Sequence, residues 1–124
     1  MKKEKMIEFQ AQDVSYSEDL EFREYFQVLF QEKDEPGVKY VLLQRQFEIP
    51  DGGVCYFECD EIERSGSHVI RKAKLSRDRF EIDVPGEDGG KWVVAFELED
   101  RRYVALKEVL SIILGKPSRL EIKG

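Results

Sequence analysis

The sequence lacks any long apolar run. Nothing in its 124 residues approaches the roughly eighteen consecutive apolar residues of a membrane-spanning helix. The charged start, MKKEKM, has no apolar segment behind it of the kind a signal peptide carries. We therefore expect a cytoplasmic protein with no membrane partner, and we expect residues 1–5 to form a disordered N-terminal tail.

The chain also has few cysteine and histidine residues. Its two cysteines, Cys55 and Cys59, lie in a segment that alternates like a strand. Their Cα atoms would then be about 13 Å apart, about twice the distance that a disulfide spans. A metal site built from them with Asp60 and His68 would lack the short paired spacing of structural zinc sites. The sequence predicts two buried thiols, no metal and no cofactor.

A single histidine restricts nucleophilic catalysis. His68 follows Ser65 and Ser67 in a predicted turn, but sequence neighbours seldom form a catalytic triad, and no Gly-x-Ser-x-Gly elbow occurs. Residues 86–91, GEDGGK, lack the Gly-Lys-Ser/Thr ending of a phosphate loop and run into a strand instead of a helix. We therefore expect no enzymatic activity.

Positive charge is in deficit. The formal net charge is −6 and the sequence pI is near 5.0, whereas a surface that binds nucleic acid normally needs a basic excess. A basic run does occur, at Arg71, Lys72, Lys74, Arg77 and Arg79. The hairpin register described below places Asp83 opposite Lys72 and Glu81 opposite Lys74, which predicts a mixed surface. Nucleic acid is not an expected partner.

The remaining composition is that of one globular domain over residues 1–124, with 41% apolar and 37% charged residues. Alternating apolar and polar residues predict strands separated by Gly, Pro and Ser turns, with a polar stretch at 12–21. The predicted strands are 7–9, 24–33, 38–47, 54–63, 68–75, 80–84, 92–99 and 120–122. The turns are 34–37, 50–53, 65–67 and 76–79.

Two strands allow a finer prediction. In the strand at 38–47, YVLL precedes Arg45. This pattern indicates a central strand that is covered on both sides at its beginning and emerges toward solvent on one side, with the aliphatic stem of Arg45 lying along apolar neighbours. Around the turn at 76–79, pairing Leu75 with Phe80 sets the register: Ala73 faces Ile82, Lys74 faces Glu81, and Lys72 faces Asp83.

Residues 101–114 follow helical spacing, with Asp100 as a candidate N-cap and with Gly115 and Pro117 as stop signals. An apolar stripe beside several strands is more often the lid of the protein's own core than a docking face. The sequence therefore predicts an α+β fold: an antiparallel, meander-like sheet of six to eight strands with one C-terminal helix packed on one face. The apolar stripe consists of Tyr103, Leu106, Val109, Leu110 and Ile113.

The order of segments resembles a known family. YVLLQRQFE, then CYFEC, KLSRDRFEIDV and FELEDRRYVALKEVLSIIL are similar to segments of the immunity protein 10 family of bacterial polymorphic-toxin systems, over about residues 24–114. The family often carries a Tyr-Gly-Gly stretch before the RDR hairpin, where this chain has ERSGSHVIRKAKL. The resemblance implies a small, non-catalytic cytoplasmic protein that binds and neutralises a cognate toxin domain.

An acidic protein suits a basic toxin, because complementary charge speeds encounter. We expect the partner-binding residues to be Asp60, Glu61 and Glu63, the densest acidic cluster outside a flexible loop. In a chain with 26 acidic residues, such a cluster is more often a solvated face than an acid–base site. We expect the protein to be a monomer or a homodimer. Two alternatives stay open: a self-associating regulatory or scaffold module that uses an exposed sheet edge, and a small enzyme or ligand carrier.

Overall fold

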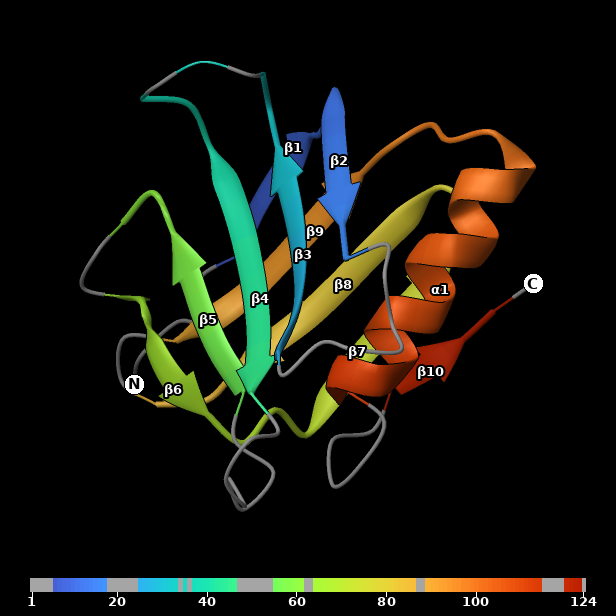
Figure 1. The fold of residues 1–124 in the computed structure, drawn as a ribbon. Coiled ribbons are helices and arrows are strands. Elements are labelled where there is room, and N and C mark those ends of the chain that lie inside the picture. The colour runs from blue at the N-terminus through green and yellow to red at the C-terminus, as the bar shows by residue number, and fades with distance from the viewer. Residues whose placement is uncertain are drawn as a thin grey trace.

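The ten described strands form two five-stranded sheets that face each other, as a computed structural model of the chain shows (Figure 1). The structure describes residues 6–17, 25–33, 35, 37–46, 55–61, 64–86, 89–114 and 120–123. The predicted tail at 1–5, the turn at 50–53 and the stop signals Gly115 and Pro117 lie outside these residues.

The first sheet, here called the meander sheet, contains five antiparallel strands in chain order. These are β2 (Asp13–Tyr16), β3 (Tyr25–Gln31), β4 (Tyr40–Gln46), β5 (Cys55–Cys59) and β6 (Gly66–His68). The turn before β4 uses Gly37 at φ 83°, a conformation that glycine adopts without steric cost. The predicted hairpin between β3 and β4 is therefore confirmed.

The second sheet, here called the mixed sheet, has an antiparallel centre and one parallel strand at each edge. Its strands, in spatial order, are β1 (Met6–Gln10), β9 (Gly90–Ala95), β8 (Arg79–Val84), β7 (Lys72–Ser76) and β10 (Leu120–Ile122). The register of β7 with β8 confirms all four predicted pairs, from Lys72 with Asp83 to Leu75 with Phe80. The short final strand at 120–122 is also confirmed.

The α+β class and the meander-like pairing are confirmed, but two sheets replace the single predicted sheet. The chain changes sheets directly after β1: the Ala11 amide donates to the Ala95 carbonyl of the mixed sheet, and the Gln12 amide donates to the Gln31 carbonyl of the meander sheet. After this bend the chain forms β2, which lies within residues 12–21, a stretch for which the sequence predicts no strand. The predicted strand at 68–75 is wrong as one element, because β6 and β7 belong to different sheets.

The core lies between the two sheets and is built from aromatic contacts across them. Phe30 of the meander sheet stacks on Phe80 of the mixed sheet, with ring centroids 5.2 Å apart. Phe57 meets Trp92 edge to face at 4.7 Å. All four side chains are fully buried. Because each pair joins the two sheets, it fixes how they pack on each other.

Helix α1 (Asp100–Leu114) lies against β2, β3 and β4 on one side and β10 on the other (Figure 1). All five residues of the predicted apolar stripe are buried, which confirms the helix as part of the core. The Tyr103 amide donates to the Glu99 carbonyl, so Glu99 occupies the N-cap position and Asp100 is the first helical residue. The N-cap prediction was therefore one residue late.

Arg45 is buried deeper than predicted. Its side chain is 8% exposed, and its Nη1 donates to the Ile113 carbonyl, 3.1 Å away, near the end of α1. The whole side chain is thus enclosed, including the guanidinium. β4 is central in its sheet, as predicted, but Tyr40 and Leu42 on its other face are half-exposed, so the expected cover on both sides is wrong.

Candidate functional site

Of the three residues in the predicted acidic cluster, the structure describes Asp60 and Glu61. Asp60 is exposed directly after β5. The Glu61 carboxylate forms an ion pair with the Arg64 guanidinium, which also donates to the Gly89 carbonyl and lies over the Trp92 ring. Glu63 lies outside the described residues. Of the two described residues, Asp60 has the exposed position that suits a long-range electrostatic contact.

The cysteines and the histidine serve the packing of β5 and β6. Cys55 and Cys59 are both buried thiols, as predicted. The Cys59 thiol donates to the Glu61 carbonyl at 3.3 Å, and burial raises the pKa of this thiol. Ser65 Oγ accepts from the Cys59 amide, and His68 pairs with Cys55 across the strands. Within the described part of the chain, no group of three or more His, Cys, Asp or Glu side chains could hold a metal ion.

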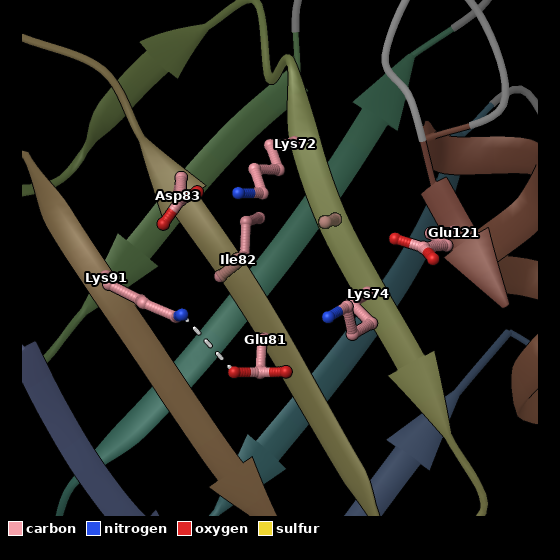
Figure 2. Close-up of a pocket in the computed structure, with 8 residues that line it drawn as sticks. Lys72, Lys74, Glu81, Ile82, Asp83, Lys91 and Glu121 are labelled. Atoms are coloured by element: carbon pink, nitrogen blue, oxygen red, sulfur yellow. Dashed lines mark ion pairs between the residues drawn. The ribbon is translucent and has the colours of Figure 1, made fainter. Parts of the chain in front are cut away.

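The outer face of the mixed sheet carries alternating charges around a small cavity of about 50 Å³ (Figure 2). Lys91 Nζ lies 3.4 Å from Glu81 Oε1 and forms an ion pair with it, while Lys74 lies opposite Glu81 in the register of β7 with β8, as predicted. One oxygen of Asp83 is buried without a hydrogen-bond partner. Three lysines and three carboxylates balance each other here, so the lining carries no net charge. The lining residues are Lys72, Ala73, Lys74, Glu81, Ile82, Asp83, Lys91 and Glu121.

The outer face of the meander sheet has the opposite character. Strand alternation and register place on it a set of half-exposed or exposed side chains in which tyrosine, glutamine, leucine and serine dominate. Of these, only Asp13 and Glu58 carry a charge, although 37% of the whole chain is charged. The described members are Asp13, Ser15, Gln27, Leu29, Gln31, Tyr40, Leu42, Gln44, Tyr56, Glu58 and Ser67.

A cluster of Tyr40, Tyr56 and Glu58, here called the tyrosine clamp, lies on this face where β4 and β5 pair. The Tyr40 hydroxyl donates to Glu58 Oε2 at 2.6 Å, and the Tyr56 hydroxyl donates to Glu58 Oε1 at 2.8 Å. Burial, followed by the bond to Glu58, raises the pKa of Tyr40. The bond to Glu58, followed by burial, raises the pKa of Tyr56. Both hydroxyls therefore stay protonated at neutral pH and keep donating to the carboxylate.

Sequence reasoning missed the tyrosine clamp, although part of its signal was visible. Tyr56 and Glu58 alternate with the buried residues Cys55, Phe57 and Cys59, so alternation alone placed them together on the outer face. Tyr40 was hidden in the apolar run YVLL, which was interpreted as fully covered. The pairing of β4 with β5 brings Tyr40 to Glu58, and that pairing follows from the fold and not from any motif.

The described residues include no helix that is both long and apolar enough to cross a lipid bilayer. Searches against protein-family models, curated proteins and solved structures find no match to this chain.

Proposed function

We propose that this protein is a non-catalytic bacterial immunity protein that binds a cognate toxin domain and neutralises it by surface contact. The observation that supports this most strongly is the outer face of the meander sheet, with its tyrosines, half-exposed leucines and few charges. The resemblance of the segment order to the immunity protein 10 family gives the proposal its partner class.

The composition of this face suits a protein partner. The centres of protein interfaces are enriched in tyrosine and depleted in lysine, glutamate and aspartate relative to other surfaces. Leu29 and Leu42 lie directly opposite each other on β3 and β4 and are both half-exposed, which gives an apolar contact at the middle of the sheet. A partner that covers them gains the free energy of removing apolar surface from water.

Charge supports a basic partner. The chain carries a formal net charge of −6, and complementary fields raise the association rate. We keep Asp60, Glu61 and Glu63 as the proposed electrostatic contacts. Alanine at all three positions is expected to weaken toxin binding and to reduce its dependence on salt. If affinity and salt dependence both stay unchanged, these three residues are not contacts.

A second candidate, a self-associating scaffold module, is favoured by a different surface. The edge strand β10 and helix α1 form a groove of about 520 Å³ lined by Val104, Lys107, Glu108, Ser111, Ile112 and Ile122. Val104 is 55% exposed and Ile122 is 42% exposed, and an edge strand offers unpaired backbone groups to another chain. Light scattering separates the candidates: a dimer that persists on dilution favours self-association.

The test of the proposed function is affinity capture from a lysate of the source cells, with the tagged protein as bait and mass spectrometry as readout. The proposal predicts recovery of one protein with a toxin-like C-terminal domain in near-equal amount to the bait. Recovery of the bait alone, from a lysate in which the candidate toxin is shown to be expressed, would reject the proposal.

A further inference from the structure

We propose that the tyrosine clamp is the docking point for a single arginine of the protein partner, carried on a segment whose neighbouring apolar side chains cover Leu29 and Leu42. This inference rests on the proposed function, because it assigns the contact through which the same partner is recognised. Three observations support it: the hydrogen-bond acceptors that the clamp leaves open, the negative charge of the clamp, and the residues that lie beside it.

The clamp offers hydrogen-bond acceptors to an approaching partner. The hydroxyl protons of Tyr40 and Tyr56 are both used in bonds to Glu58. An ionised carboxylate only accepts, and a hydroxyl whose proton is engaged has only its lone pairs left. A group that docks here must therefore supply donors, which selects a guanidinium or an ammonium over an amide carbonyl or a carboxylate.

The arrangement of the free acceptor sites favours a guanidinium over an ammonium. Each oxygen of Glu58 takes one tyrosine hydroxyl, and a carboxylate oxygen can accept two hydrogen bonds. One site per oxygen is left, which is the pattern that the two parallel N–H groups of arginine fill. The planar guanidinium can also stack on an aromatic ring, whereas a lysine ammonium is a strongly hydrated point charge.

The charge of the surrounding face also favours a cationic group such as arginine. Among the described outward-facing residues of β2 to β6 there are two acids, Asp13 and Glu58, and no lysine or arginine. Asp60 follows at the end of β5 and is exposed. No cation among the described outward-facing residues therefore compensates the negative charge of Glu58, whereas Glu81 on the mixed sheet pairs with Lys91.

The residues beside the clamp define the rest of the contact. Leu42 lies directly opposite Glu58 across β4 and β5, and Leu29 lies directly opposite Leu42. Side chains directly opposite in an antiparallel sheet have Cβ atoms about 5 Å apart. Leu42 therefore lies next to the Glu58 side chain, and Leu29 lies next to Leu42 on the far side. An arginine with one or two apolar neighbours in its own segment fits this row of acid and leucines.

The probe for the test is a random twelve-residue peptide library displayed on phage and selected on the wild-type protein. Selected peptides are synthesised and titrated by calorimetry against three proteins: wild type, Glu58→Gln, and Glu81→Gln as a matched control on the mixed sheet. Circular dichroism melting of each variant shows that it is folded.

The proposal predicts that selected peptides share an arginine flanked by apolar residues. Glu58→Gln should weaken binding by at least about tenfold, because charge-assisted hydrogen bonds contribute more than neutral ones. Glu81→Gln should bind as wild type does. Replacing the peptide arginine by lysine should weaken binding, and replacing it by alanine should abolish it.

The proposal is overturned if no peptide is enriched, if enriched peptides lack arginine, or if they bind Glu58→Gln as tightly as wild type. It is also overturned if light scattering shows a wild-type dimer that Glu58→Gln converts to a monomer, because the occupant is then a second copy of the chain. A captured toxin that binds Glu58→Gln normally rejects this inference and leaves the proposed function standing. Arginine peptides that need Glu58, combined with a capture experiment that yields no toxin, reject the proposed function instead.

Discussion

The guanidinium of Arg45, on the central strand β4, donates a hydrogen bond to the carbonyl of Ile113 near the end of helix α1, 68 residues away in the sequence. The last turn of α1 contains no basic residue of its own. A helix C-terminus carries partial negative charge and unpaired carbonyls, so a cation there is stabilising. Arg45, which lies on the sheet, therefore supplies the cation at the C-terminus of α1 that the helix's own sequence lacks.

Replacing Arg45 by methionine should destabilise the protein by about 2 kcal/mol, because a buried carbonyl loses a charged donor while the apolar stem is retained. Urea unfolding followed by circular dichroism measures the change. Arg71→Met, at an exposed position, is the control and should have little effect. Equal losses in the two variants would show that the bond to Ile113 contributes nothing specific.

Phe80→Ala should cost about 3–5 kcal/mol, because it leaves a cavity in a fully buried aromatic contact. Phe80 stacks on Phe30 of the opposite sheet, so the variant weakens the packing of one sheet on the other. Val104→Ala, at a side chain that is 55% exposed, serves as the control for loss of apolar area. A loss for Phe80→Ala as small as that for Val104→Ala would contradict the packing of the two sheets.

Cys55 and Cys59 should react with a thiol reagent only after unfolding. Both are buried, and burial raises the pKa of the Cys59 thiol, which disfavours the reactive thiolate. A colorimetric thiol assay should therefore detect almost no thiol in the native protein and two thiols per chain in denaturant. Rapid reaction of either cysteine in the native protein would mean that β5 is more accessible than the structure indicates.

His68 should make stability depend on pH in the weakly acidic range. Burial lowers the pKa of His68 in the folded state, so the unfolded chain binds a proton more readily. The contribution of His68 is then fully present above its unfolded pKa, about 6.5, and is lost as pH falls through the folded value. Urea unfolding midpoints are measured between about pH 5.5 and 7.5, a window above the ordinary carboxyl pKa values. As pH falls, the midpoint of His68→Gln should decline less than that of the wild type. An identical decline in the two proteins contradicts this role of His68.

The tyrosine clamp should be visible in an alkaline titration of the isolated protein. Burial and the hydrogen bond to Glu58 raise the pKa of Tyr40, and the hydrogen bond to Glu58 and burial raise the pKa of Tyr56. Their ultraviolet tyrosinate signals should therefore appear at higher pH than that of an ordinary tyrosine. Because the folded pKa values are raised, this part of the stability is lost as pH climbs above about 10, the unfolded value. Glu58→Gln should shift both titrations to lower pH; unchanged titrations would show that the clamp does not form.

Local features of the fold followed from the sequence because they depend on alternation and turn chemistry. The register of β7 with β8 was predictable since a tight turn at residues 76–79 fixes every later pair. The apolar stripe of α1 was predictable from helical spacing alone. In both cases the residues that determine the structure are close together in the sequence.

Features that join distant segments of the chain could not be predicted from the sequence. Alternation assigns faces to a strand but does not say which sheet it joins, so the division into two sheets and the bend at Ala11 and Gln12 were missed. The charge count identified acidic residues but not their partners, and Arg64 neutralises Glu61 through a loop contact that charge density cannot reveal. The tyrosine clamp was missed for the same reason, because it needs the pairing of β4 with β5.

The most direct test of the account is a paired capture experiment with three baits: wild type, Leu42→Lys on the outer face of the meander sheet, and Lys74→Gln on the outer face of the mixed sheet. All three are first shown to be folded by thermal melting. The account predicts that wild type and Lys74→Gln retain the same toxin-like protein in near-equal amount, and that Leu42→Lys does not. Equal retention by all three would place the binding surface elsewhere and contradict the central claim.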